Sequence, residues 1–164
     1  MFPKPKSVLV PNTYAYESEP MVKATGFREY DARWLFGKEI NLMGIQALGM
    51  GLGALIAELG VKQEVVTGHD FRGYSASIKY ALISGLQAAG CKVHDIGLCM
   101  TPMAYFAQFE LDVPCVAKVS GRLAPILTPV QPLSLCDAVT IATQGTSRSN
   151  CAKYAIGVMH RPMS

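Results

Sequence analysis

QEVVTGHDFRGYSASIKYALISGLQAAGCKVHDIG, residues 63–97, is the stretch that decides the fold. Residues 63–68 are rich in β-branched side chains and end on a glycine, which predicts a strand. Residues 76–89 repeat apolar side chains at helical spacing, and Ser75 stands where an N-cap is expected. Residues 91–96 alternate apolar and polar side chains and predict a second strand. The stretch therefore reads as strand, helix, strand.

The flanking sequence extends this alternation on both sides. Residues 38–60 are rich in Leu, Ala, Met and Gly and predict a long helix that Gly60 ends. Thr101 can cap a third helix that runs through residues 103–109, and residues 113–117 predict a further strand. Short connections between alternating elements predict an α/β fold, specifically a three-layer α/β/α domain with a mixed, largely parallel sheet.

Strand ends predict where a ligand would bind. In open α/β sheets, ligands bind beyond the carboxyl ends of the strands. We therefore expect residues 67–73, residues 97–101 and whatever follows Ala117 to surround one crevice.

Composition divides the chain into three segments. Residues 1–21 carry four prolines and predict an irregular N-terminal arm, and residues 22–117 form the α/β/α unit, with a short strand expected over 22–26. Residues 1–117 hold 10 Lys and Arg against 11 Asp and Glu, whereas residues 118–164 hold 5 against 1. Prolines also interrupt this last segment, so we expect an irregular, poorly structured C-terminal tail.

The composition and the net charge exclude several classes of protein. Half of the 164 residues are hydrophobic, 16% are charged and the net charge is +3, which does not suit a disordered chain. No run of basic residues suggests nucleic-acid binding. The five cysteines lack metal spacing, so reduced thiols and a cytoplasmic location are expected. Residues 40–57 are uncharged, but their polar and glycine residues favour a buried helix over a membrane span.

The most polar stretch is GFREYDAR, residues 26–33, which has no apolar period. Two interpretations are open. Its arginines can pair with its own acidic residues in a solvated loop, or an arginine can contact a ligand.

Three motifs carry a resemblance to a known family. GFREYDAR, then VVTGHDFRGYS at 65–75 and GLQAAGCKVHDIGLCMTPMAYFA at 85–107, resemble domain I of the α-D-phosphohexomutases, in particular the bacterial phosphomannomutase/phosphoglucomutase group. The resemblance implies an isomerase of carbohydrate metabolism. Such enzymes use Mg²⁺ and a phosphoserine to move a phosphoryl group between the 1- and 6-positions of a hexose phosphate.

The resemblance also assigns roles to particular residues. Tyr30 and Arg33 match the family's Tyr-Asp-x-Arg and would bind substrate, with Arg33 as the catalytic phosphate contact. Asp31 would fix the loop by pairing. Asp70 and Arg72 match a Gly-x-Asp-x-Arg element, which we interpret as a structural brace.

The chain departs from the family after residue 117. The family has Val-Thr-Ala-Ser-His-Asn there, whereas this chain has Lys118-Val119-Ser120-Gly121-Arg122-Leu123. Arg122 thus takes the place of the nucleophilic serine, and Leu123 that of its histidine neighbour. Ser120 lies two residues early and has no adjacent histidine, so we do not expect it to substitute. Asp137 is the only acidic residue of the tail, so no Mg²⁺ loop is expected there.

Two functions follow as hypotheses. The first is a truncated phosphohexomutase-like protein, inactive as an isolated chain, whose residues 118–164 come from a shifted reading frame. The second is a non-enzymatic α/β module that binds a phosphorylated ligand or a protein partner and can self-associate through exposed apolar surface. No metal role is expected for His69, His94 or His160, and no glycine fingerprint supports a dinucleotide-binding oxidoreductase.

Overall fold

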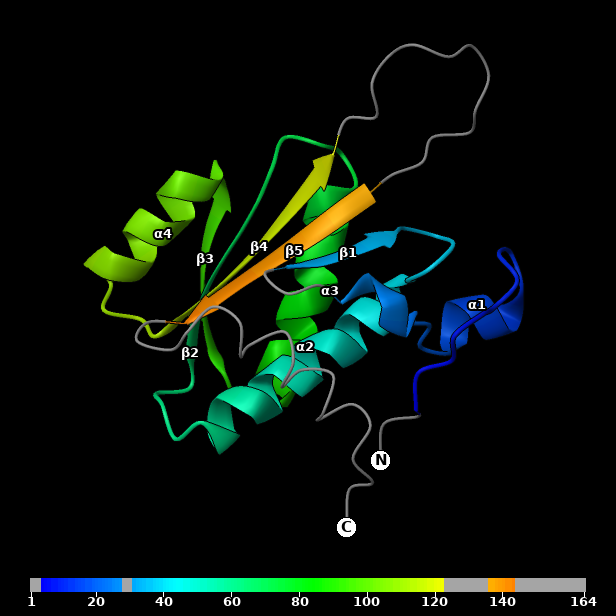
Figure 1. Ribbon diagram of the computed structural model, residues 1–164, viewed down its shortest axis with the longest axis horizontal. Helices are drawn as coiled ribbons and strands as arrows, with labels where there is room; N and C mark the ends of the chain where they lie inside the picture. The colour runs from blue at the N-terminus through cyan, green and yellow to red at the C-terminus, as the bar shows by residue number, and fades with distance from the viewer. Residues whose placement is uncertain (1–3, 28–30, 123–135, 144–164) are drawn as a thin grey trace.

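The computed structural model describes residues 4–27, 31–122 and 136–143. Over these residues the chain forms one sheet of five strands with helices on both faces (Figure 1). The strands are β1 (Ala32–Leu35), β2 (Glu64–His69), β3 (Lys92–Leu98), β4 (Cys115–Arg122) and β5 (Cys136–Thr143). The helices are α1 (Tyr14–Ser18), α2 (Leu42–Glu58), α3 (Ser75–Ala88) and α4 (Thr101–Glu110), with a 3₁₀ turn over Ala24–Gly26.

Strand order confirms the predicted mixed sheet. The order across the sheet is β1-β5-β4-β2-β3. β2 pairs in parallel with both β3 and β4, as expected for strands joined by crossover helices. β5 is antiparallel to β4 on one side and to β1 on the other. The last described strand therefore lies between β4 and β1, and the sheet is parallel only on the β3 side of β4.

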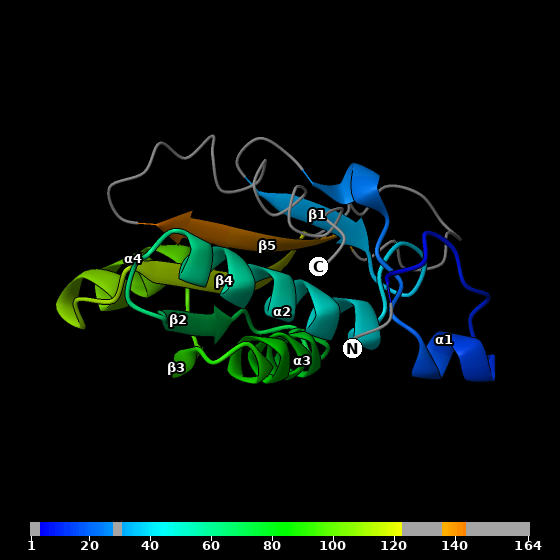
Figure 2. The ribbon, with the colours of Figure 1, turned by 90° about the horizontal axis from the view of Figure 1, so that it is seen from below.

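The helices form the outer layers of a three-layer arrangement. Helices α2 and α3 lie side by side (Figures 1 and 2) and pack on the same face of the sheet. Helix α4 covers the opposite face, where Ala104 packs with Val66 and Val116 of the sheet. This confirms the α/β/α fold class predicted from the alternation of strands and helices.

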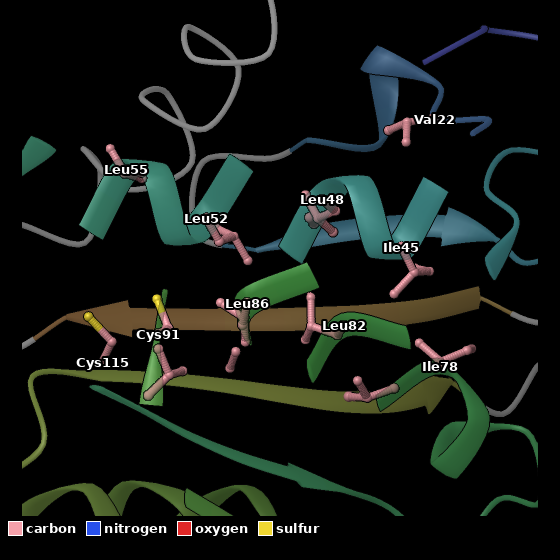
Figure 3. Close-up of a cluster of buried hydrophobic side chains, with 14 of the residues drawn as sticks. Val22, Ile45, Leu48, Leu52, Leu55, Ile78, Leu82, Leu86, Cys91 and Cys115 are labelled. Carbon is pink, nitrogen blue, oxygen red and sulfur yellow. The ribbon is translucent and has the colours of Figure 1, made fainter. Parts of the chain in front are cut away.

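The larger core lies between α2, α3 and the sheet (Figure 3). Leu48 and Leu52 of α2 face Leu82 and Leu86 of α3, and all four side chains are at most 3% exposed. Burying a side chain of this size contributes about 1.5–3 kcal/mol. This apolar face explains why a glycine-rich helix is stable here.

Glycines at the α2–α3 contact let the two helices approach closely. A Cβ added at Gly85 would overlap the backbone carbonyl of Gln46, and one added at Gly49 would overlap the carbonyl of Leu82. The helices therefore touch backbone to backbone at two points. The glycines in residues 38–60 serve packing, as the buried-helix interpretation requires.

Several element boundaries differ from the predictions. Helix α2 begins at Leu42 rather than at residue 38, because the Asn41 side chain caps it by accepting a hydrogen bond from the Gly44 N–H at 2.7 Å. The strand expected over 22–26 is wrong, since Ala24–Gly26 is a 3₁₀ turn packed under Trp34. Tyr74, rather than Ser75, is the N-cap of α3.

The expected tail, residues 118–164, also differs from its prediction where it is described. β4 continues from Cys115 to Arg122, and Cys136–Thr143 forms β5. Both segments are strands because they pair with strands that are distant in the sequence. Local composition carries no information about such pairing, so the prediction missed them. The prolines that suggested irregularity, at 125, 129 and 132, lie outside the described residues. Within the part of the chain that is described, no helix is both long and apolar enough to cross a membrane.

Replacing Gly85 with Ala tests the close helix contact. The added methyl group would force α2 and α3 apart, and overpacking of this kind costs about 1–3 kcal/mol in the free energy of unfolding. Urea denaturation followed by circular dichroism measures this loss. Gly73→Ala is the matched control, because a Cβ at Gly73 meets no atom within 4 Å. Equal stability of the two variants would contradict the contact.

Candidate functional site

A crevice of about 580 Å³ opens at the carboxyl ends of the parallel strands. It is lined by residues 70–72 after β2, by residues 98–103 from the end of β3 into the first turn of α4, and by Lys118 and Ser120 of β4. These segments overlap those that the predicted strand ends were expected to bring together. The sequence therefore located the crevice correctly.

Asp70 joins three elements at one edge of this crevice. One carboxylate oxygen, Oδ2, accepts a hydrogen bond from the Gly121 N–H at 2.8 Å and also contacts the Arg72 guanidinium. The other, Oδ1, accepts from the Ser75 hydroxyl at 2.6 Å and from the Arg72 N–H at 3.3 Å. The carboxylate thus connects the end of β2, the start of α3 and the end of β4.

These contacts explain the charge state of Asp70. Burial alone would raise its pKa, but the hydrogen bonds from Ser75, Gly121 and Arg72 outweigh burial and hold the pKa below its ordinary value of 3.8. The Arg72 guanidinium also lies over the Phe71 ring, 4.9 Å from its centroid. The contacts agree with the interpretation of Asp70 and Arg72 as a structural brace.

Arg33 lies on β1 and faces the α4 side of the sheet. Its neighbour Trp34 belongs to the larger core under α2, and adjacent strand residues point to opposite faces. Its guanidinium pairs with Asp31, with Nε 2.8 Å and the terminal nitrogen 2.6 Å from the same carboxylate oxygen. Asp31 therefore holds Arg33, as expected. Tyr30, the other predicted substrate residue, lies outside the described residues.

β5 places Arg33 in one row with Ser120. Arg33 pairs with Ala138 of β5, and Ala138 pairs with Ser120 of β4. Residues directly opposite each other in antiparallel strands share a face, and two strand spacings separate their Cα atoms by about 10 Å. Arg33 and Ser120 thus lie on the same face of the sheet near its ligand-binding edge.

Lys118 is on that face as well. Its neighbours Ala117 and Val119 belong to the larger core, so Lys118 points to the α4 side, where it lines the crevice. The lysine is 4% exposed. Sequence analysis did not single it out, although an isolated lysine at the apolar positions 115–119 was a usable signal. It pairs in register with Gly68, where a Cβ would overlap the Cys99 sulfur.

Metal ligands do not assemble in the described part of the chain. None of its His, Cys, Asp and Glu residues form a group of three that could hold a metal ion. His94 Nε2 lies 2.8 Å from Glu64 Oε2, and this contact, together with Lys62, lowers the pKa of Glu64 to about 2. His69 Nδ1 is buried without a partner among those residues, and His160 lies outside them. The described residues do not fit the family's Mg²⁺.

Comparison with known proteins shows which family this domain resembles. The family model described as phosphoglucomutase/phosphomannomutase, alpha/beta/alpha domain I, matches residues 24–122. A phosphomannomutase from Salmonella typhimurium is 40% identical over 106 residues, which is 65% of this chain but 22% of that relative. One from Klebsiella pneumoniae is 38% identical over 106 residues, covering 65% of each chain.

A solved structure shows the same fold. The crystal structure of a phosphoglucomutase/phosphomannomutase family protein from Burkholderia thailandensis superposes with a TM-score of 0.70 at 23% identity. The superposition covers 85% of this chain and 30% of that one. The superposed part of this chain therefore spans less than a third of the length of that protein.

Replacing Asp70 with Asn tests the brace. The variant loses the negative charge that faces Arg72, and its amide N–H groups would face groups that are themselves donors. Together these changes should lower the free energy of unfolding by about 2–4 kcal/mol at pH 7. Because the folded-state pKa is lowered, the contribution of Asp70 is present above its ordinary value of 3.8 and is lost as pH falls below it. The stability gap between wild type and variant should therefore shrink toward pH 3.

Urea denaturation at several pH values measures this gap. Asp112→Asn, a change of the same type at an exposed residue, is the control and should alter stability by less than about 0.5 kcal/mol. An Asp70→Asn variant as stable as wild type at pH 7 would contradict the bracing role.

Proposed function

The chain belongs to the phosphoglucomutase/phosphomannomutase family through the α/β/α domain I of that family, and from this we propose that it binds the phosphate group of a hexose phosphate without transferring it. In the family, as the sequence resemblance implies, a serine after the last strand of this domain carries the phosphoryl group. The proposal keeps the recognition of the phosphate and assigns no chemical step to this chain.

The observation that carries the binding half of the proposal is the position of Arg33. The sheet register puts Arg33 in one row with the end of β4, where the family's serine loop would begin. A guanidinium is always charged and offers two parallel N–H donors to a pair of phosphate oxygens. Its ion pair with Asp31 holds the group at the sheet edge, while its side chain stays 47% exposed.

The identity of residue 122 supports the second part of the proposal, that the chain does not transfer the phosphoryl group. A guanidinium at the nucleophile's position has no oxygen to form a phosphate ester, so Arg122 cannot replace a serine. Ser120 is the nearest hydroxyl in sequence, but it lies within β4, paired with Ala138, rather than in a loop. Among the described residues no base contacts it. We likewise propose that this chain binds no Mg²⁺ on its own.

The origin of the departure stays a prediction. The family match ends at residue 122, in the middle of the motif where the resemblance is lost, which supports the proposal of a shifted reading frame. Sequencing the locus tests it, because another frame should then encode Thr-Ala-Ser-His-Asn. We also propose a cytoplasmic location, supported by Cys91, Cys99 and Cys115 being free thiols.

A coupled mutase assay and a binding measurement separate the two halves of the proposal. With mannose 1-phosphate, Mg²⁺ and a hexose bisphosphate activator, we expect no turnover above the blank. Calorimetric titration with the same sugar phosphate should show binding, which Arg33→Met weakens at least about tenfold because a charged hydrogen-bond donor is lost. Lys38→Met, at an exposed residue five positions further on, should bind like wild type.

Two outcomes of these measurements would contradict the proposal. Turnover comparable with a full-length phosphomannomutase would overturn the proposed inactivity. Binding that is undetectable in wild type, or unchanged in Arg33→Met, would overturn the assigned phosphate contact.

An exposed apolar surface favours a second candidate function, the binding of a protein partner. Helix α4 presents Met103, Phe106 and Phe109 to solvent, with Phe106 65% and Phe109 74% exposed, and Leu98 and Met100 extend the same surface. Contiguous apolar surface of this kind marks interaction sites in many proteins. A second copy of the chain is the simplest partner to test.

Size-exclusion chromatography over a range of protein concentrations tests this candidate. We expect wild type to shift to a larger apparent size as concentration rises, because association buries the aromatic rings of α4. The double variant Phe106→Glu/Phe109→Glu should elute as a monomer at all concentrations. Tyr14→Glu, at an 87% exposed ring on α1, is the control and should behave like wild type. A wild-type monomer throughout would count against self-association.

A further inference from the structure

Lys118 is a buried cation whose charge the described residues do not balance by a direct contact. The lysine is 4% exposed and lines the crevice at the carboxyl ends of the parallel strands. Within the described ranges, its ammonium group has no hydrogen-bond or ion-pair partner. The other buried lysine does have one, since Lys79 Nζ lies 2.6 Å from Asp95 Oδ2. A counter-charge for Lys118 would have to come from the space that it lines.

The charged side chains around that space leave a single positive charge in excess. Among the described residues, two cations, Arg72 and Lys118, and one anion, Asp70, line the crevice. Asp70 and Arg72 form an ion pair, so their charges cancel. A ligand with one negative charge would balance Lys118, whereas a dianion would leave a negative charge in excess.

The start of α4 offers few donors to a multiply charged ligand. Pro102 has no N–H, and the N–H groups of Met103 and Ala104 donate to the Met100 carbonyl at 3.1 and 3.3 Å. These amides are therefore already engaged. The lysine is thus the main group in the crevice that can attract an anion.

Much of the crevice wall is apolar. Phe71 and Leu98 line it and are 75% and 63% exposed. A second space, of about 440 Å³, shares Cys99, Pro102 and Met103 with the crevice, so the two spaces adjoin. Methionine side chains adapt to apolar groups of different shapes. An apolar ligand could therefore extend from the crevice past Met103 into the second space.

The position of α4 explains the second space. The helix packs mainly on β2 and β4, where Ala104 meets Val66 and Val116. The edge strand β3 is less well covered, and Ile96 on it is only partly buried. Ile96 and Phe106 are among the residues that line the second space, one on β3 and the other on α4.

We propose that the two spaces form one groove that binds an amphipathic monocarboxylate, such as a medium-chain fatty acid. The carboxylate pairs with Lys118, and the hydroxyls of Thr101 and Ser120, which line the same space, can donate hydrogen bonds to it. The hydrocarbon chain lies along Met103 toward Ile96. The groove does not involve Arg33, so the proposal does not rest on the phosphate contact proposed above.

Calorimetric titration of the wild-type chain with octanoate tests the ligand class. The protein concentration is one at which size-exclusion chromatography shows a single species, because Phe106 also belongs to the surface considered for self-association. Octanol, which has the same chain without the charge, should bind at least about tenfold more weakly. Butyrate should also bind at least about tenfold more weakly, because its shorter chain buries fewer CH₂ groups.

Lys118→Met tests the ion pair. The variant keeps an unbranched side chain and loses a buried charge, so it should fold at least as well as wild type. Its Kd for octanoate should be at least about tenfold weaker, while its Kd for octanol should stay the same. Lys92→Met makes the same change at a lysine whose side chain is 69% exposed, and it should bind octanoate like wild type.

Met103→Gln tests the apolar part of the groove. It places a polar group between the two spaces and should weaken octanoate and octanol alike, by about threefold or more. Leu111→Gln is the control, because Leu111 is 47% exposed on the same helix end and lines neither space. Two-dimensional ¹H–¹⁵N NMR locates the ligand, since octanoate should shift the amide signals of Cys99, Met103 and Lys118.

Four results would overturn the proposal. They are undetectable octanoate binding, octanol binding as tight as that of octanoate, unchanged octanoate binding in Lys118→Met, and displacement of octanoate by an equal concentration of inorganic phosphate. The last would show that the crevice selects oxyanions without regard to the apolar chain. Three of these measurements use wild type alone, so they decide the question even if Lys118→Met fails to fold.

Discussion

The carboxylate of Asp70 is the contact on which the ligand-binding edge depends. It receives hydrogen bonds from the Ser75 hydroxyl, the Gly121 N–H and Arg72, and so adds side-chain contacts to three segments that backbone hydrogen bonds also connect. Loops at such edges carry few apolar contacts of their own. Because the four donors converge on one charged group, the end of β4 and the start of α3 keep fixed positions relative to β2.

Much of the fold could be predicted from the sequence, because local patterns agree with the final structure there. Gly60 and Gly90 follow the ends of α2 and α3 with φ of +67° and +89°, so both helix ends were readable as glycine stops. β1 and β5 were not predicted, since their pairing with distant residues outweighs local composition. Ser75 was read as a cap, but its hydroxyl bonds to Asp70 instead.

The candidate site was predictable only in part, for a similar reason. The carboxyl ends of the predicted strands located the crevice, and the motif resemblance indicated Arg33. Lys118 could not be placed on the α4 face of the sheet from the sequence, because only the packing of its neighbours Ala117 and Val119 into the larger core shows which way it points. The row through Arg33, Ala138 and Ser120 likewise depends on β5, which no local pattern indicated.

The position of β5 has a consequence for biosynthesis. This strand is the last one described along the chain, yet it fills a place inside the sheet, between β4 and β1 (Figure 1). Until residue 143 has left the ribosome, β1 has no partner among β2, β3 and β4, and β4 presents a row of unpaired backbone groups. Unpaired strand edges recruit other chains. The nascent polypeptide therefore passes through an aggregation-prone stage that ends only when β5 pairs, and slow translation of residues 136–143 would prolong that stage.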